Sequence, residues 1–422
     1  MSTNLVIDIV AFGVEIGKLG YDINTKKSFF QYNPELLESG RYSRMFPYLF
    51  KRVKHVQVFT QFEGKTFKGL PPMIADSLPD VFGNLIFKEW FEARHSALAR
   101  ITPLEQLTYI ANRGMGALEY RPVKEIGTIA AIDIDEIVKV LNKVMRAKKD
   151  TSGESLSDLA LLTIFKIGTS AGGARPKILV SEHKQTGTII PGDIEYSDEY
   201  APYLVKLSLD EAAGYNKEIV EYAYYLLAKE IGIAMMNSKL IDGKHFATLR
   251  YDRQNGKKKH VLTACGLTGW DFLEPENASY ENLFRLASDL KVPHKDLQEL
   301  YKRMVFNLVF ANIDDHLKNH SFIYDEENNS WNLAPAYDLT YPLNALNNYL
   351  RVTRALAVNG KREGINGDDL LEIAATFAIK NPKGIIREVQ NATALWPSVA
   401  AQTGVPDAVI TAIGNAFETF LS

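Results

Sequence analysis

A short run of polar side chains near residue 314 combines the residue types needed to transfer a phosphoryl group. Residues 311–319 read ANIDDHLKN and follow an amphipathic segment that ends near Phe310, so we expect a loop at a helix end. Asp314 and Asn319 are five positions apart. The carboxylate can face a substrate hydroxyl, while the neutral amide oxygen can face a magnesium ion on the other side of the phosphates.

The same five-residue offset separates the catalytic base from the metal-binding asparagine in protein-kinase catalytic loops. Asp and Asn also favour turns, so a plain turn is the alternative interpretation of this loop taken alone. Asp338 lies in the short apolar stretch 331–339, where a carboxylate is expensive to bury unless it is paired or bound to a metal. It is placed where a second magnesium ligand is needed. An N-cap or turn aspartate is the alternative for Asp338, which is followed by Leu-Thr rather than by the Phe-Gly of most kinases.

Two charged residues upstream extend the pattern. Lys206 lies in an apolar strand predicted over 203–207, from which its ammonium group can hold the α- and β-phosphates of a nucleotide. Glu221, one turn into a helix predicted over 216–231, is the carboxylate chosen to pair with Lys206. A lysine that only extends from an edge strand toward water is the alternative.

Small residues dominate the segment 168–177, which reads GTSAGGARPK and precedes a predicted strand. Small side chains let backbone N–H groups approach phosphate oxygens closely. The segment is neither a Walker A loop nor a kinase G-x-G-x-x-G, and a flexible turn explains it equally well when it is taken alone. The specific signal is the order of the five features along the chain, because it is the order that a kinase needs.

Apolar periodicity predicts the elements that must position these residues. Residues 4–33 and 53–69 are typical of short strands and turns, closed by a helix over 80–94. Further strands are predicted over 177–180, 187–190, 203–207, 239–241, 246–251 and 260–264. Helices are predicted over 135–145, 156–165, 216–231, 280–290, 295–311, 367–378, 383–395 and 407–420, with a polar linker at 148–154.

This distribution predicts an α+β, bilobal protein-kinase-like fold with a β-rich N-terminal subdomain and a helical C-terminal lobe. We expect three segments: the β-rich subdomain at 1–100, the remainder of the N-lobe with the phosphate loop and the lysine at 101–250, and the helical C-lobe with the catalytic and metal-binding loops at 251–422. Nucleotides commonly bind between two such lobes.

Composition limits the remaining possibilities. The chain has 422 residues, 46% of them hydrophobic, and a formal net charge of -3, so bulk charge does not predict a nucleic-acid coat. The single cysteine, Cys265, excludes an intrachain disulfide and a multi-cysteine metal site. The eight histidines show no HxH or HExxH spacing, which argues against a metal-dependent hydrolase. We expect a cytoplasmic protein with no secretion signal and no membrane span.

The motifs resemble those of the HipA family of kinases. Residues 170–177 look like its phosphate loop, 312–319 like its catalytic loop and 334–339 like its metal-binding segment. The N-terminal part is similar through residues 29–32, 69–72 and 80–84. The resemblance implies a serine/threonine protein kinase that uses ATP and Mg²⁺.

The resemblance also implies a role for each site residue. Asp314 is expected to be the catalytic base, with His316 of the same loop assigned beside it as catalytic, and Asn319 and Asp338 are expected to bind magnesium. The expected ATP-binding residues are Ser170, Ala171, Gly172, Gly173, Ala174, Lys206, Glu221, Leu249 and Tyr251. Ser170 matches an autophosphorylated serine. Its modification adds roughly -2 charge and should expel the phosphate loop by repulsion.

The implied partners are those of a toxin–antitoxin system. A small HipB-like DNA-binding antitoxin would neutralise the kinase and connect it indirectly to DNA, and the protein substrate would be an aminoacyl-tRNA synthetase whose phosphorylation inhibits translation and growth. Asp315 departs from the family's best-known member, where a glycine stands. Two alternatives are a small-molecule kinase, which needs no β-rich N-terminal unit, and a catalytically silent corepressor, against which the intact site residues argue.

Overall fold

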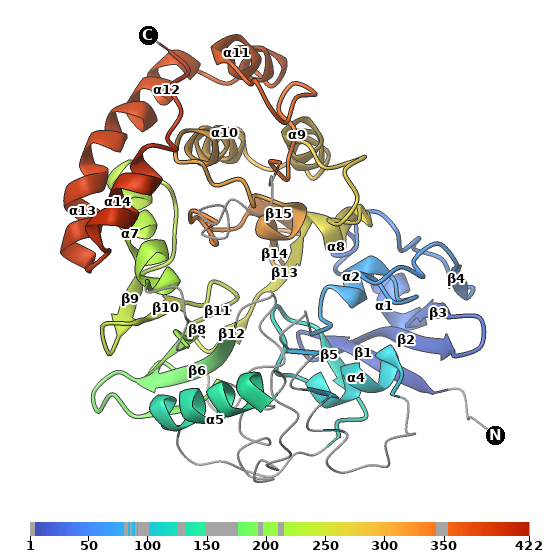
Figure 1. The fold of residues 1–422 in the computed structure, drawn as a ribbon. Helices are drawn as coiled ribbons and strands as arrows, with labels where there is room; N and C mark the ends of the chain where they lie inside the picture. The colour runs from blue at the N-terminus through green and yellow to red at the C-terminus, as the bar shows by residue number, and fades with distance from the viewer. Residues whose placement is uncertain are drawn as a thin grey trace. The chain divides into compact units, whose positions relative to one another are not determined.

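A computed structural model describes most of the chain, in two compact units. The described residues are 5–79, 83–84, 87–88, 91, 101–124, 132–147, 176–192, 197–209, 215–342 and 353–421. The first unit comprises Met1–Ala212 and Ala247–Val261, and the second comprises Ala213–Phe246 and Leu262–Ser422. Figure 1 shows the elements of each unit. The predicted linker, the helix over 156–165, most of the helix over 80–94 and the phosphate loop as far as Arg175 lie outside the described residues.

The first unit begins with a five-stranded antiparallel sheet in the order β4-β3-β2-β1-β5. Its strands are β1 Val6–Ala11, β2 Val14–Asp22, β3 Lys27–Tyr32, β4 Gln57–Phe59 and β5 Glu119–Arg121. Ile7, Leu19 and Phe30 pair across three strands and are at most 1% exposed, whereas the next pair, Asp8 and Lys18, forms an exposed ion pair. This alternation buries one face of the sheet and leaves the other in water.

Three short helices of the first unit follow strands of this sheet in the sequence. They are α1 Pro34–Ser39, α2 Pro72–Ala75 and α4 Pro103–Ile110. Asn33 caps α1 through its side chain, and Thr102 and Glu105 form a capping box at α4. The predicted hairpin over 53–69 reduces to strand β4, because the rest of that stretch forms turns.

A second sheet in the first unit carries Lys206. Strands β6 Lys177–His183, β7 Ile189–Pro191, β8 Tyr200–Lys206 and β10 His245–Leu249 are arranged in the order β7-β6-β8-β10. The predicted helix over 135–145 is present as α5 Ile134–Ala147. Strands β6 and β8 are antiparallel, and their register sets Lys177 directly opposite Lys206.

A buried ion cluster joins two distant segments of the first unit. Asp252, which is fully buried, accepts bonds from Arg250 and Arg253 at 2.8 and 2.7 Å and from the Gly116 amide at 2.7 Å. Both arginines also donate to the Gly114 carbonyl, at 3.2 and 2.9 Å. The small hairpin β11 Arg253–Gln254 and β12 Lys257–Lys258 follows this cluster.

The second unit is mainly helical. Its helices are α7 Lys217–Glu230, α8 Ala264–Thr268, α9 Tyr280–Asp289, α10 His294–Val309, α11 Gly367–Thr376, α12 Pro382–Asn391, α13 Trp396–Thr403 and α14 Asp407–Gly414. Tyr224 of α7, Phe306 and Phe310 of the α10 region and Trp396 of α13 form edge-to-face or stacked ring contacts at its core. These contacts fix α7 against α10 and α13.

Two predictions for the second unit differ from the structure. The helix predicted over 383–395 is α12, followed by a 3-10 turn at Ala392–Leu395, with α13 starting directly after it. The predicted helix over 407–420 ends at Gly414. A short hairpin, β14 Ser321–Asp325 with β15 Ser330–Leu333, adjoins β13 His260–Thr263 and was not predicted. The three-segment division stays a prediction, and the compact units place α7 and β9 Ser238–Ile241 with the C-terminal helices.

Candidate active site

The candidate catalytic loop begins where helix α10 ends. Phe310 is the C-cap of the helix, and Ala311 adopts a positive φ of 53°, which turns the chain out of the helical path. Residues 312–316 then run without regular structure into the 3-10 turn Leu317–Asn319. The loop predicted at a helix end is therefore present at this position.

Asp314 lies in the irregular part of this loop, and Asn319 is the last residue of its 3-10 turn. Asp314 is exposed. Asn319 is half-buried, and its Nδ2 donates to the backbone carbonyl of Asp314 at 2.9 Å. This bond orients the amide so that its oxygen is directed away from the Asp314 carbonyl, as a metal-binding amide oxygen needs.

The segment that leads to Asp338 is fixed by hydrogen bonds of its main chain. The Ala334 and Ala336 amides donate to the carbonyls of Ser321 and Ala234 at 2.9 and 2.8 Å, and Arg303 of α10 donates to the Ala334 carbonyl at 2.7 Å. Asp338 itself has a positive φ of 53°, a conformation that few residues other than Gly, Asn and Asp adopt readily. Such a backbone turn directs the half-buried carboxylate away from the extended path of the segment.

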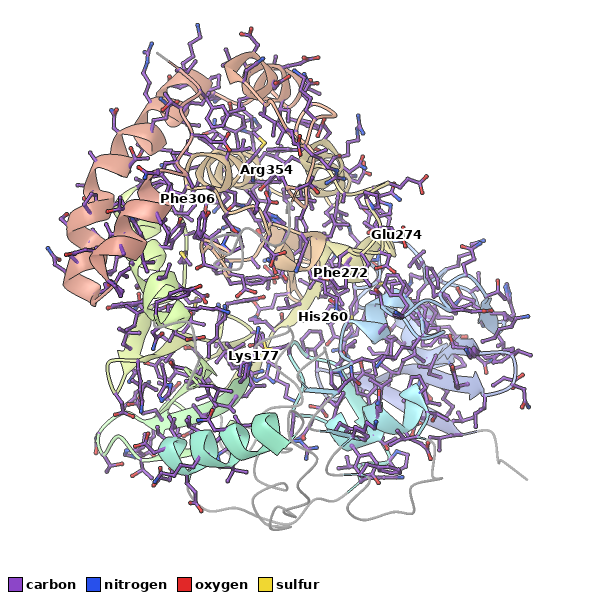
Figure 2. All side chains as sticks on the ribbon, in the orientation of Figure 1. Lys177, His260, Phe272, Glu274, Phe306 and Arg354 are labelled. Carbon is purple, nitrogen blue, oxygen red and sulfur yellow. The ribbon has the colours of Figure 1, made fainter. Side chains whose placement is uncertain are left out.

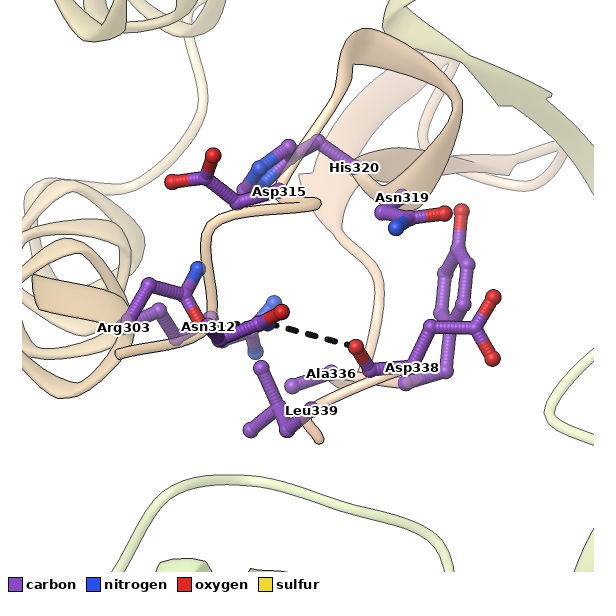
Figure 3. A pocket seen from close by; sticks show the side chains of 10 residues that line it. Arg303, Asn312, Asp315, Asn319, His320, Ala336, Asp338 and Leu339 are labelled. Carbon is purple, nitrogen blue, oxygen red and sulfur yellow. Dashed lines mark hydrogen bonds between the residues drawn. The ribbon is translucent and has the colours of Figure 1, made fainter. Parts of the chain in front are cut away.

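Asn319 and Asp338 line the same small pocket, and their side chains extend to the same side of it in Figure 3. The pocket has a volume of about 10 Å³, which is room for one water-sized group and not for a nucleotide. Carboxylate and amide oxygens are the ligands that Mg²⁺ prefers. The buried Oδ1 of Asn312, also on the pocket wall, has no hydrogen-bond partner within the described part of the chain. The residues present therefore fit a magnesium ion.

His320 is the buried histidine of this pocket. Burial, with the nearby charge of Arg303, lowers its pKa to about 3, while a bond to the Asp315 backbone opposes this shift. The ring is therefore neutral at physiological pH. His316, which was predicted to be catalytic, lies elsewhere: its ring centroid is 5.1 Å from that of Phe272, whose ring is also covered by the Lys318 ammonium at 5.0 Å. Its catalytic role stays a prediction.

The predicted nucleotide-binding residues fall into three groups. Lys206 is buried at the end of β8, opposite the equally buried Lys177. Figure 2 labels Lys177 on its strand. Glu221 is buried on α7 of the second unit, and its pairing with Lys206 stays a prediction. Leu249 ends β10, and Tyr251 follows in a turn, both half-buried. Ser170, Ala171, Gly172, Gly173 and Ala174 lie outside the described residues.

Sequence reasoning missed the partners of Asp315. This residue is 1% exposed, and its carboxylate accepts bonds from Tyr280 at 2.7 Å and from Arg354 at 3.2 Å. Arg354 lies among the helices of the second unit in Figure 2. The partners are 35 and 39 positions away, so no local motif marks them. The one available signal was a second acidic residue directly beside Asp314.

A loop with Asp314 and Asn319 after a buried helix, followed by a hairpin and an anchored aspartate, defines a protein of the α+β, kinase-like class. The sequence profile of the HipA-like C-terminal domain matches residues 169–396, and that of the HipA N-terminal domain matches residues 7–121. The first match alone covers more than half of the chain. The chain belongs to the HipA family.

Individual relatives agree with this membership. The chain is 23% identical over 189 residues to a protein of Sinorhizobium fredii named putative kinase Y4dM, covering 41% of this chain and 45% of that protein. It is 26% identical over 145 residues to the serine/threonine-protein kinase toxin HipA of Shewanella oneidensis, covering 29% and 33%. The chain thus spans less than half the length of these curated relatives.

A solved structure confirms the predicted fold class. The chain matches the Shewanella oneidensis HipA of a toxin–antitoxin complex of HipA, HipB and operator DNA with a TM-score of 0.64 and 16% identity, over 97% of this chain and 95% of that one. Among the described residues, no helix combines the length and apolar character needed to cross a membrane.

Proposed function

We propose that the protein is an ATP-dependent serine/threonine protein kinase of the HipA type. The observation that carries this proposal is the second unit's loop geometry: an exposed Asp314 whose carbonyl holds Asn319, and an Asp338 that lines the same pocket as Asn319. Phosphoryl transfer requires little more from a protein than a base, metal ligands and positive charge at fixed positions.

In the proposed reaction, the Asp314 carboxylate accepts the proton of a serine or threonine hydroxyl. The hydroxyl oxygen then forms a bond to the γ-phosphorus of ATP while the bond from that phosphorus to the β-γ bridging oxygen breaks, and ADP leaves with the bonding electron pair. Asn319 and Asp338 would hold Mg²⁺, which when bound neutralises phosphate charge. The exposed position of Asp314 suits a protein substrate, because a hydroxyl on another chain can reach it.

The positive charge that phosphoryl transfer requires is assigned in this proposal to a strand of the first unit. Lys206 ends β8, is 6% exposed and stands directly opposite Lys177, which is 5% exposed. We assign Lys206 to the phosphates, Glu221 to the orientation of Lys206, Leu249 and Tyr251 to the adenine, and residues 170–174 to the phosphate loop.

The biological role proposed for the kinase is that of a toxin. A HipB-like antitoxin, and through it operator DNA, are the proposed partners, because the matched HipA was solved with both. An aminoacyl-tRNA synthetase is the proposed substrate, so that phosphorylation inhibits translation, and Ser170 is the proposed site of autophosphorylation.

Incubation with ATP and Mg²⁺, followed by mass spectrometry of the intact protein and its peptides, tests the proposal. We expect one added phosphate on the peptide 169–177 in the wild-type protein and none in Asp314→Asn. Asp407→Asn, which changes an exposed carboxylate at the start of α14, is the matched control and should behave as wild type. Nucleotide binding without any transfer, to itself or to added synthetases, would instead support a silent corepressor.

A further inference from the structure

Asp315 differs from its neighbour Asp314 in its burial and in the hydrogen bonds that its carboxylate accepts. Asp314 is exposed, whereas Asp315 is buried and accepts hydrogen bonds through both oxygens. The Tyr280 hydroxyl and Arg354 Nη1 donate to Oδ2 at 2.7 and 3.2 Å, and the Leu356 amide is 3.3 Å from Oδ1. A buried carboxylate with a charged partner and two further donors fixes the local chain direction.

The segment 354–356 binds the backbone of the catalytic loop as well. Arg354 Nη1 donates to the carbonyls of Asn312 and Asn307 at 3.1 and 3.3 Å. The Ala355 amide donates to the Ile313 carbonyl at 2.9 Å. The three residues that precede or open the loop are therefore held by the same short segment that binds Asp315.

These bonds continue from Asp315 to the segment that carries Asp338. Asn307 Nδ2 donates to the Tyr280 hydroxyl at 2.9 Å, and Asn312 Nδ2 lies 2.9 Å from the Asn307 Oδ1 and 3.3 Å from the Asp338 carbonyl. Figure 3 shows the bond between Asn312 and Asp338. We call Tyr280, Asn307, Asn312, Asp315 and Arg354 the Asp315 network.

Tyr280 is the central donor of this network. Burial, together with the charge of Asp315, raises the pKa of Tyr280 well above its ordinary value. The hydroxyl therefore keeps its proton at any physiological pH and donates to Asp315 while it accepts from Asn307. The Tyr280 oxygen thus links Asp315 to Asn307, whose Oδ1 accepts from the Asn312 side chain that also donates to the Asp338 carbonyl.

We propose that Asp315, acting through Tyr280, is a positioning residue that holds Asp314 at a fixed separation from Asp338. Its kinetic consequence rests on the proposed phosphoryl transfer, in which the hydroxyl held by one aspartate must meet the phosphate held by the metal on the other. A displacement of about 1 Å between reacting groups can lower a rate by about 10²-fold. Tyr280 and Asp315 are buried, whereas Asp314 is exposed, so changes at these two residues should act on the rate more than on nucleotide binding.

Tyr280→Phe is the test variant, because it removes one hydroxyl and keeps the ring packed. Tyr301→Phe is the matched control: Tyr301 is also fully buried, and its hydroxyl donates to the Leu370 carbonyl at 3.1 Å, outside the network. We expect Tyr280→Phe to lower kcat by about 10- to 100-fold with KM for ATP changed less than about twofold. Tyr301→Phe should change neither constant.

Amide hydrogen exchange of the nucleotide-free protein tests the positioning without any need for activity. We expect faster exchange in both segments 311–319 and 334–339 of Tyr280→Phe, and no change in either segment of Tyr301→Phe. Unchanged exchange in Tyr280→Phe would overturn the inference whatever its kcat. An inactive wild-type protein would refute the proposed kinase instead, and the exchange result would still decide the role of the network.

A second variant tests whether Tyr280 and Asp315 act on kcat through the hydrogen bond between them or independently of each other. Asp315→Asn removes the charge and keeps the shape, and we expect it to lower kcat as Tyr280→Phe does. If both act through the same hydrogen bond, the double variant should be little worse than the more severe single one. Additive losses would show that Tyr280 and Asp315 act separately, which contradicts the proposal.

Discussion

The ion cluster around Asp252 should be the most stabilising polar feature of the first unit. Its carboxylate is fully buried and accepts four hydrogen bonds, two from Arg250, one from Arg253 and one from the Gly116 amide. Burial by itself raises the pKa of Asp252, but the charges of the two arginines outweigh burial and lower this pKa from 3.8 to about 2. That difference corresponds to about 2 kcal/mol of stability at neutral pH.

Asp252→Asn removes the charge from this cluster while keeping its shape. Because the two buried guanidiniums lose the carboxylate that they both bind, we expect the free energy of unfolding to fall by about 3–5 kcal/mol. Urea unfolding followed by circular dichroism measures the loss. The control is Asp8→Asn, whose ion pair with Lys18 is exposed and screened by water, and which should leave the unfolding midpoint unchanged.

The pH dependence provides an independent check. The folded-state pKa of Asp252 lies below that of the unfolded chain, so the folded protein binds fewer protons in that range. The contribution is therefore complete above pH 3.8 and declines as the pH falls toward 2. A loss below about 1 kcal/mol in Asp252→Asn, or an equal loss in Asp8→Asn, would refute the view that burial makes this cluster strong.

Three further predictions concern the second unit and the buried histidines. Asp338→Asn should keep the fold, since Asn tolerates the left-handed backbone, and should weaken magnesium-dependent nucleotide binding by about 10- to 100-fold; equal affinity by calorimetry would contradict a ligand role. Trp396→Ala should lower the free energy of unfolding by about 3–5 kcal/mol, since its side chain is only 1% exposed and its indole N–H donates to the Ile410 carbonyl; urea unfolding measures this loss. Burial lowers the pKa of His260 and His320 from 6.5 to about 3, so stability should be complete above pH 6.5 and fall as the pH decreases. Melting temperatures that stay equal at pH 7.5 and pH 5 would argue against this.

Long helices were predictable because their apolar period repeats several times. Helices α7 and α10 were expected over 216–231 and 295–311, and each is present within two residues at both ends. The hairpin β14–β15 was missed although strands of similar length were predicted elsewhere. Phe322, Ile323 and Tyr324 of β14 are three consecutive apolar residues, which show no alternation between apolar and polar side chains.

The candidate site also contains residues that the sequence could predict and residues that it could not. Asp314 and Asn319 could be found from their spacing, because both lie on one short loop that a single bond closes. The Asp315 network could not, because its bonds to Tyr280, Arg354 and Asp338 connect segments that the sequence separates and that only tertiary packing brings together. What looked like a departure from the family motif is, in the structure, a buried ion pair.

The ion cluster of the first unit also connects the two family domains of this chain. Gly114 and Gly116 fall in the N-terminal family domain, residues 7–121, whereas Arg250, Asp252 and Arg253 fall in the C-terminal one, residues 169–396. Recombination at the boundary between the two family domains would therefore separate the carbonyl and amide groups of the cluster from their charged partners. A Cβ at Gly116, whose φ is +79°, would also lie 3.2 Å from the Val261 carbonyl oxygen. A chimera that replaces residues 7–121 of this chain should therefore lose stability unless the replacement offers the same backbone groups to Arg250, Asp252 and Arg253.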